Sequence, residues 1–347
     1  MSLRRTPTHS LPAMALTLWL ALAATAAADK VTLLPDAPGK DRSHIGKVTA
    51  ESPTEVTIGT QKVPVEQIES ITYEVKAASS ITTAVQREKD GKLAEAAADY
   101  KAAVDASESG SFVAQAAAFA RLRILAQLKP AEAITGLDAF TRDPANKAGR
   151  HIVPALDLLI RLAMAKADYD RADRAVAILE KVPTPTAPDR AAVARARILT
   201  KRGKPADAAA MLDKLIAGAK ADTPKGREVR LAKAEALAAD KKYDDARKLA
   251  MEAIDAASTE DADALSTGYN TLGDILRAAG KPKDALLAYL HTDLLFAKDR
   301  DEHARALAQI ASLWRELKRE DRADETLERL KHDYPASPWL ASTGGGK

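Results

Sequence analysis

Alanine residues recur at a nearly constant interval along most of this chain, and this periodicity constrains the fold more than any other feature. The successive intervals are 37, 39, 36, 38, 39 and 38 residues. The alanines concerned are Ala96, Ala133, Ala172, Ala208, Ala246, Ala285 and Ala323. Most of them are followed four residues later by a large apolar residue, as Ala96 is by Tyr100, which places both on one helix face. A constant period of this size predicts a solenoid of stacked helical units, whereas a plain helical bundle would not require it.

The composition favours thin helices that pack at short distance. Apolar residues make up 46% of the chain, but aromatic residues make up only 4%. Alanine supplies much of the apolar content, and it combines the highest helix propensity with a small side chain. We therefore expect a mainly α fold rather than a large β-sandwich.

The sixth unit carries the clearest motif of the repeat. Its large, apolar and small residues follow one another as Tyr269, Leu272, Gly273, Gly280, Ala285 and Tyr289. The last unit has Ala323 and Pro335 in corresponding places. In these residues the chain resembles tetratricopeptide-repeat proteins over 76–340, and its last unit resembles repeats of exported bacterial envelope proteins. The resemblance implies a right-handed α–α superhelix of about seven helix pairs.

The close contacts and the bend of the sixth unit can be assigned to particular residues. Gly273 and Ala285 should let the two helices of the unit approach each other, and Gly280 should form the bend between them. The second and third units depart from the signature, because Arg121 and Ile160 stand where a small residue is expected. The period also exceeds the family's repeat length of about 34 residues. The borders of the units are therefore only approximate in the sequence.

Residues 29–75 have a different character from the rest of the chain. Short β-branched runs alternate with turn residues, and Val56 and Ile58 alternate with polar neighbours as in a half-buried strand. The order of these runs resembles small SH3-like or Sm-like barrels. Tyr73 is the only aromatic residue of the segment, which disfavours an RNA-stacking surface. We expect a structural or protein-binding cap, and we expect the repeats to fold without it because each repeat contacts mainly its neighbours.

The N-terminal residues have the parts of a secretory signal peptide. Arg4 and Arg5 precede an apolar run over 11–24, and the small residues at 26–28 offer a cleavage site before Asp29. A retained membrane anchor is the alternative, but the apolar run is short for that role. The chain has no cysteine, so no lipid anchor is expected. We expect a signal peptide over 1–28 and a periplasmic or secreted mature protein without a membrane anchor.

Charge and motif content point away from an enzyme. Without residues 1–28 the formal net charge falls from +3 to +1, because two arginines and no acids are removed, so no general attraction to nucleic acid follows. The remaining five histidines lack the spacing of a zinc-binding helix pair. Neither a nucleophile elbow nor a glycine-rich phosphate loop occurs. No cofactor, metal site or nucleic-acid partner is therefore expected, and residues 341–347 are expected to form a flexible tail.

The resemblance also implies where a partner would bind. In tetratricopeptide proteins the first helix of each unit lines a groove, and that register falls here on Arg197, Glu235, Asn270, Asp274 and Arg277. An asparagine there can hydrogen-bond a peptide backbone, and the two arginines can hold a carboxylate, although a merely solvated helix face is the alternative.

A protein–protein interaction scaffold is the function that these features favour, with a partner peptide or helix bound in the groove. The alternative is a fixed structural subunit of a cell-envelope assembly. A carbohydrate-binding or catalytic role is the lesser alternative. The identity of the partner and the oligomeric state are left open by the sequence.

Overall fold

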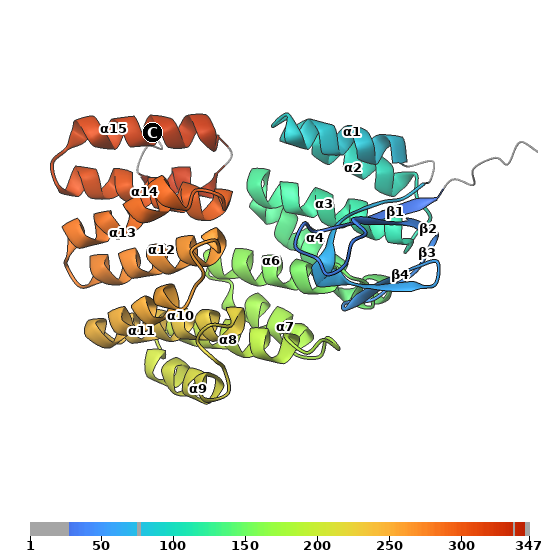
Figure 1. The fold of residues 1–347 in the computed structure, drawn as a ribbon. Coiled ribbons are helices and arrows are strands. Elements are labelled where there is room, and N and C mark those ends of the chain that lie inside the picture. The colour runs from blue at the N-terminus through green and yellow to red at the C-terminus, as the bar shows by residue number, and fades with distance from the viewer. Residues whose placement is uncertain (1–27, 75–77, 336, 344–347) are drawn as a thin grey trace, which may run out of the picture.

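A computed structural model describes residues 28–74, 78–335 and 337–343 of the chain. The expected signal peptide over 1–28 lies almost wholly outside the described residues, as do the last four residues of the expected tail. Within the described residues a small β domain comes first and a long array of helices follows it (Figure 1).

The β domain consists of two three-stranded antiparallel sheets, with strand orders β2-β1-β6 and β3-β4-β5. Its elements are β1 (Asp29–Leu33), β2 (Ser43–Gly46), β3 (Val48–Glu51), β4 (Glu55–Ile58), β5 (Gln61–Pro64), a 3-10 turn (Val65–Gln67) and β6 (Ile68–Thr72). Only Lys47 separates β2 from β3, so the chain passes directly from one sheet to the other. Val56 and Ile58 on β4 point inward and are buried, as their alternation with polar residues predicted. A small N-terminal β domain of two sheets therefore precedes the helices, as expected.

The helices form seven consecutive antiparallel pairs, as the sequence period predicted. The pairs are α1 (Ala78–Lys89) with α2 (Leu93–Asp105), α3 (Phe112–Leu128) with α4 (Pro130–Arg142), α6 (Ile152–Ala165) with α7 (Tyr169–Leu179), α8 (Ala187–Lys201) with α9 (Pro205–Ala217), α10 (Pro224–Ala239) with α11 (Tyr243–Asp255), α12 (Ala262–Ala278) with α13 (Pro282–Leu295), and α14 (Arg300–Glu316) with α15 (Glu320–Asp333). A short helix, α5 (Pro144–Lys147), lies between the second and third pairs, and a 3-10 helix (Pro338–Thr343) follows the exposed Pro335. The array curves so that α1 and α15 lie on one side of the molecule and α9 on the other (Figure 1).

Each pair is built around the same buried alanine. All seven periodic alanines occupy the fourth position of the second helix, and all are fully buried. The first helix presents a small buried residue twelve positions earlier in five of the pairs: Ala84, Ala196, Ala234, Gly273 and Ala311. Because these side chains end at Cβ or before it, the two helix backbones can approach closely, which explains why the period is kept.

The two departures from the small-residue pattern are accommodated in different ways. Arg121 stays at the surface of the second pair and forms an ion pair with Glu132 at 2.8 Å. The close contact of that pair is made by Gly136 on the second helix, which packs against Leu122. Ile160 in the third pair is simply buried in the core. Both units are therefore regular helix pairs despite their sequences.

The turns between the two helices also repeat. In six pairs the residue two positions before the second helix has a positive φ; these residues are Gly91, Ala167, Gly203, Lys241, Gly280 and Lys318. The next residue donates its backbone N–H to a carbonyl five residues earlier, as Lys281 does to Leu276 at 2.9 Å. This is the Schellman ending of a helix, for which glycine is the least strained residue. The bend expected at Gly280 is confirmed.

Substitutions at these turns should change stability in opposite directions. Gly280→Ala should lower the free energy of unfolding by about 1 kcal/mol, because a Cβ is strained at the φ of +72°. Lys241→Gly should raise the free energy of unfolding by about 0.5 kcal/mol. The substitution removes the backbone strain at a φ of +62°, and this gain is partly offset because glycine increases the conformational entropy of the unfolded chain. Lys242→Gly, at a φ of −87°, is the control and should give no gain. Urea denaturation of the full chain measures all three, and equal shifts for Lys241→Gly and Lys242→Gly would contradict the assignment.

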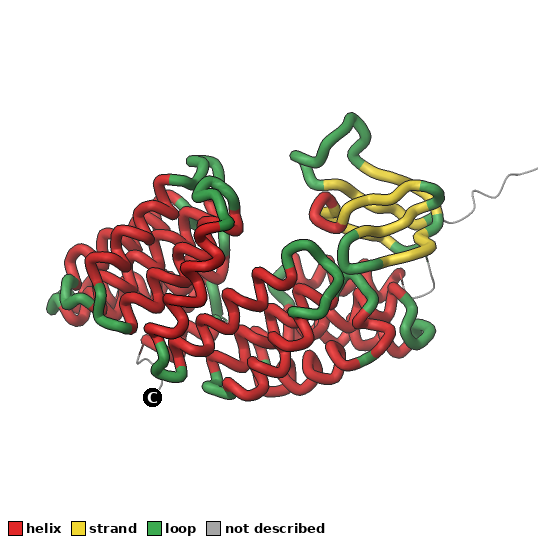
Figure 2. The backbone as a smooth tube through the Cα atoms, turned by 90° about the horizontal axis from the view of Figure 1, so that it is seen from below, coloured by secondary structure: helices red, strands yellow, loops and turns green. Residues whose placement is uncertain are grey.

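The β domain and the first helix pairs share one hydrophobic core. Val31 and Tyr73 of the β domain belong to the same buried cluster as Ala84, Tyr100 and Ile124 of the first three helices. Figure 2 shows the strands lying against this end of the helical array. This arrangement speaks against the expectation that the repeats form a fully independent unit, since removing residues 29–74 would expose part of this core.

Candidate functional site

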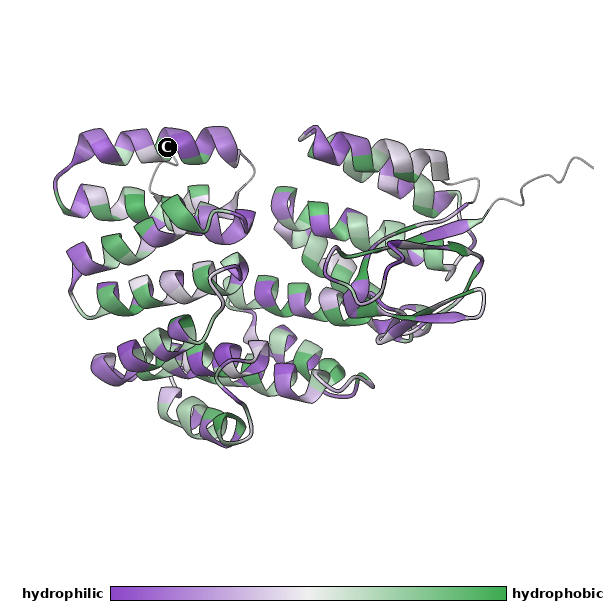
Figure 3. Cartoon of the chain, viewed as in Figure 1, coloured by the Kyte–Doolittle hydropathy of each residue, from purple (hydrophilic) through white to green (hydrophobic). Residues whose placement is uncertain are grey.

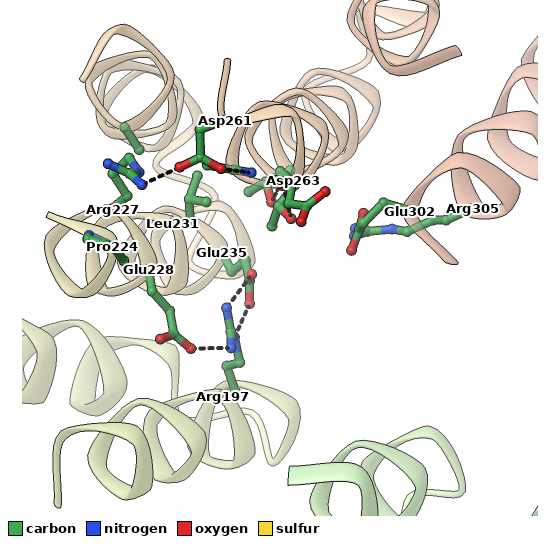
Figure 4. A pocket seen from close by; sticks show the side chains of 14 residues that line it. Arg197, Pro224, Arg227, Glu228, Leu231, Glu235, Asp261, Asp263, Glu302 and Arg305 are labelled. Carbon is green, nitrogen blue, oxygen red and sulfur yellow. Dashed lines mark hydrogen bonds and ion pairs between the residues drawn. The ribbon is translucent and has the colours of Figure 1, made fainter. Parts of the chain in front are cut away.

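A cavity of about 630 Å³ opens on the side of the solenoid formed by the first helices of the pairs. Helices α8, α10, α12 and α14 supply nearly all of its walls (Figure 4). The lining residues are Arg197, Pro224, Arg227, Glu228, Leu231, Glu235, Ala253, Asp261, Asp263, Ala264, Thr267, Thr271, Glu302 and Arg305. Arg197 and Glu235 are the two predicted groove residues that the structure brings into this cavity. Their helices lie next to each other in the array, as the resemblance implied.

Arg197 lies between two carboxylates of the next unit. Its Nε lies 3.2 Å from Glu235 Oε2, and its Nη1 lies 3.5 Å from Glu228 Oε1. The Glu235 carboxylate raises the pKa of the Arg197 guanidinium. Figure 4 shows the two glutamates on α10 flanking the arginine from α8. Arg197 is therefore already held by this chain, and it is not a free carboxylate binder.

Arg227 connects the fifth unit with the start of the sixth. It donates to Asp261 Oδ2 at 2.6 Å and to the Asp222 carbonyl at 2.7 Å. Asp261 at the same time caps α12, since its Oδ1 accepts from the backbone N–H of Ala264. Capping and ion pairing by one carboxylate fix the beginning of α12 at the rim of the cavity.

Arg305, on α14, likewise links two successive units at the opposite wall of the cavity. It pairs with Glu302 at 3.1 Å and with Asp274, which also accepts a hydrogen bond from the Tyr289 hydroxyl. Burial lowers the pKa of the Arg305 guanidinium, but the carboxylates of Asp274 and Glu302 more than offset this and raise it. Asp274, a predicted groove residue, thus joins the sixth unit to the seventh and lies outside the cavity lining.

Asn270 and Arg277, two further predicted groove residues, lie outside the cavity lining and contact α14. Asn270 is fully buried, and its amide nitrogen donates to the carbonyl and carboxylate of Glu302 at 2.9 and 2.7 Å. Arg277 donates to Gln309 at 2.6 Å and to Ser312 at 2.8 Å. Both side chains hold α12 against α14. Charge reversal at Arg277 should therefore lower stability, contrary to the idea of a side chain free to grip a partner.

The sequence did not single out Arg227, Glu228, Asp263, Glu302 or Arg305 as groove residues. All five lie on first helices: Arg227 and Glu228 on α10, Asp263 in the first turn of α12, and Glu302 and Arg305 on α14. Their pairing depends on how successive units are rotated relative to each other, which the repeat period does not specify. Charged residues are no more frequent on these first helices than on the second helices of the same units, so composition could not have indicated them.

The other polar clusters have structural roles. His303 contacts Asp293 at 2.8 Å and the Tyr334 hydroxyl at 2.6 Å, and Arg329 holds both oxygens of Asp293. This chain of contacts fastens the end of α15 to α13 and α14. The described residues contain no group of three or more potential metal ligands. None of the helices in the described part of the chain has the length and apolarity needed to cross a membrane.

Comparisons with known proteins give matches in structure but not in sequence. No family model and no curated protein matches the chain. A tetratricopeptide repeat protein from Parabacteroides merdae superposes on 77% of this chain and 98% of its own, with 15% identity and a TM-score of 0.47. PilW, a type IV pilus biogenesis factor, covers 77% of this chain and 97% of its own, with 15% identity and a TM-score of 0.39. A Rap protein complexed with competence and sporulation factor covers 77% and 78%, with 11% identity and a TM-score of 0.47.

The geometry of the chain itself decides the fold class. Seven consecutive helix pairs share one buried alanine position, and six of them share one turn geometry. The helical array is a tetratricopeptide-type solenoid. Its inner surface is formed by the first helices, and the cavity lies where four of these helices converge.

Proposed function

We propose that this protein is a non-enzymatic interaction scaffold that holds a segment of a partner protein in the cavity of its solenoid. We further propose that it acts in the periplasm or outside the cell, as the signal-peptide pattern of its first residues favours. The partner segment would lie across α8, α10, α12 and α14 as an extended peptide or a helix.

The observation that supports this proposal best is the preformed cavity. Its volume of about 630 Å³ falls within the range of roughly 300–1,000 Å³ that is typical of ligand pockets. Its three arginines are fixed by ion pairs to carboxylates of neighbouring helices, so the walls need little ordering when a partner binds.

Site-specific crosslinking tests the proposal. A photoreactive benzoylphenylalanine in place of Thr267, which lines the cavity, should crosslink to a protein in an envelope extract. The same group in place of Lys248, which is exposed on α11, is the control and should not crosslink to that protein. Crosslinks of equal yield from both positions, or from Lys248 alone, would place the contact outside the cavity.

The proposed location has its own test. We predict that N-terminal sequencing of the protein recovered from the producing cells begins at or near Asp29, because the small residues at 26–28 form the cleavage pattern. Recovery of an intact Met1 from the mature protein would contradict export by this route.

A fixed structural subunit is the second candidate function, and one observation favours it. Leu287, Leu294 and Leu295 on α13 are exposed large apolar residues. The equivalents of Leu287 in the two neighbouring second helices are Lys248 and Glu325. Figure 3 shows hydrophobic residues on α13, whereas α15, on the other side of α14, is almost wholly hydrophilic. A permanent contact would cover such residues, so the Leu287→Lys/Leu294→Lys variant should lose a stoichiometric partner if this candidate is correct.

A further inference from the structure

We propose that the cavity selects a partner segment that carries lysine or arginine side chains. This inference rests on the proposed scaffold function and adds the chemistry of the partner to it. It reverses the expectation from the sequence that arginines of the groove would hold a carboxylate.

The first reason is the charge of the walls. Three arginines line the cavity together with five carboxylates, which leaves a formal excess of two negative charges. The carboxylates are Glu228, Glu235, Asp261, Asp263 and Glu302. Outside residues 1–28 the chain carries a formal charge of only +1, so the acidic excess is local to this surface. A cavity whose walls carry a net excess of one sign of charge concentrates ligands of the opposite sign.

The second reason is that two of the three arginines, Arg227 and Arg197, lie deeper than the cavity acids that bind them, whereas Arg305 and Glu302 are equally exposed at 20%. The Arg227 side chain is 10% exposed, whereas that of its partner Asp261 is 36% exposed. Arg197 is 29% exposed, whereas Glu228 and Glu235 are 46% and 38% exposed. The outer atoms that an incoming segment meets are therefore mainly carboxylate oxygens. These oxygens can accept further hydrogen bonds while they keep their arginines.

Asp263 makes this preference specific to the cavity. It is exposed in the first turn of α12, and no cation of the described residues lies within ion-pair distance of its carboxylate. Leu231, Ala253 and Ala264 line the same cavity and offer apolar surface. A lysine or arginine can place its aliphatic stem on such surface while its charged end reaches a carboxylate.

An acidic segment would be disfavoured for the opposite reason. To bind a carboxylate, Arg197 or Arg305 would have to leave partners at 3.2 and 3.1 Å, and the released acids would remain beside the new one. Like charges brought together at a binding surface oppose association, so the existing ion pairs discriminate against anionic segments.

Fluorescent peptides of one repeated sequence test the charge preference on the full chain. The three probes repeat Gly-Ser-Leu-Lys, Gly-Ser-Leu-Gln or Gly-Ser-Leu-Glu, and fluorescence anisotropy at low and high salt measures their affinities. The lysine probe should bind at least about fivefold more tightly than the glutamine probe at low salt, and this difference should shrink as salt screens it. The glutamate probe should bind most weakly.

A pair of charge reversals locates the effect. Asp263→Lys should weaken binding of the lysine probe at least about fivefold. Asp284→Lys is the matched control, because Asp284 lies in the first turn of α13 and outside the cavity lining; it should leave that affinity nearly unchanged. Equal weakening by both variants would overturn the proposal, as would glutamine or glutamate probes that bind as tightly as the lysine probe. If the glutamine or glutamate probe binds tightly and the bulky Thr267→Trp change abolishes that binding, the charge preference is wrong but the scaffold function stands. If no probe binds, the result counts against both the charge preference and the scaffold function.

Discussion

Replacing Gly273 by leucine is expected to lower the free energy of unfolding by about 3 kcal/mol or more. A Cβ at this position would lie 2.6 Å from Cζ of Tyr289 and 2.7 Å from its Cε1, closer than real atoms approach. The Tyr289 ring is fully buried, and its hydroxyl donates to Asp274, so it cannot move aside without losing both packing and a hydrogen bond. The leucine would force α12 and α13 apart, and urea denaturation of the full chain would show the loss.

Two further variants show whether the contact with Tyr289 is the cause. Gly218→Leu is the control, because a Cβ there would have only the Leu215 carbonyl oxygen nearby, at 3.9 Å. It should change stability by less than about 1 kcal/mol. Gly273→Ala combined with Tyr289→Leu should be more stable than the two single changes predict together, since the smaller side chain makes room. A Gly273→Leu protein that unfolds at the urea concentration of the wild type would refute this account of the sixth unit.

The helix pairs could be predicted from the sequence because their determinants are local. Ala285 and Gly273 are twelve residues apart, and both act within one pair of helices. The period of the alanines gave the number of pairs without knowledge of any contact between units. Gly136 shows the limit of this reasoning. In the second pair the small residue at the close contact lies on the second helix, whereas the repeat signature expects it on the first helix.

The candidate site could be predicted only in part, because it depends on contacts between units. Arg197 and Glu235, which the resemblance assigned to the groove, line the cavity, but the resemblance gave no information about which charges would neutralise each other. Asn270 was expected to face a ligand, yet the rotation of α14 onto α12 buries it against Glu302. The contact between the β domain and the helices could not be predicted from the sequence either, because it joins Glu51 to Arg150, which are 99 residues apart.

Glu51 and Arg150 form a buried ion pair between the β domain and the start of the third helix pair. The Arg150 Nε lies 3.0 Å from Glu51 Oε2, and the side chains are 16% and 0% exposed. The Tyr73 hydroxyl also donates to the Glu51 carboxylate. Burial raises the pKa of Glu51, although the charge of Arg150 and the hydrogen bond from Tyr73 act against this.

Arg150→Met should therefore destabilise the protein by about 3–5 kcal/mol near neutral pH, because it leaves a buried carboxylate without its countercharge. Arg142→Met is the control: the ion pair of Arg142 with Asp138 is exposed, so its loss should cost about 0.5 kcal/mol or less. The Glu51→Gln/Arg150→Met double variant should recover much of the stability, since no charge remains to be buried. Denaturation of the full-length variants in urea measures each difference.

The pH dependence of the Arg150→Met defect identifies the carboxylate as its source. Removing Arg150 takes away an interaction that lowers the pKa of Glu51, so the pKa of Glu51 in the folded variant rises further above its ordinary value of 4.5. The folded variant then favours protonated Glu51. The stability that this preference contributes is fully present below about pH 4.5 and is lost as the pH rises through the pKa of Glu51 in the folded state. The stability difference between wild type and Arg150→Met should accordingly be smallest near pH 4.5 and should grow toward pH 8. The double variant lacks the titrating group and should follow the wild type over this range much more closely. A defect of constant size from acidic to alkaline pH would show instead that Arg150 acts through packing alone, and that the charge of Glu51 does not fasten the β domain to the solenoid.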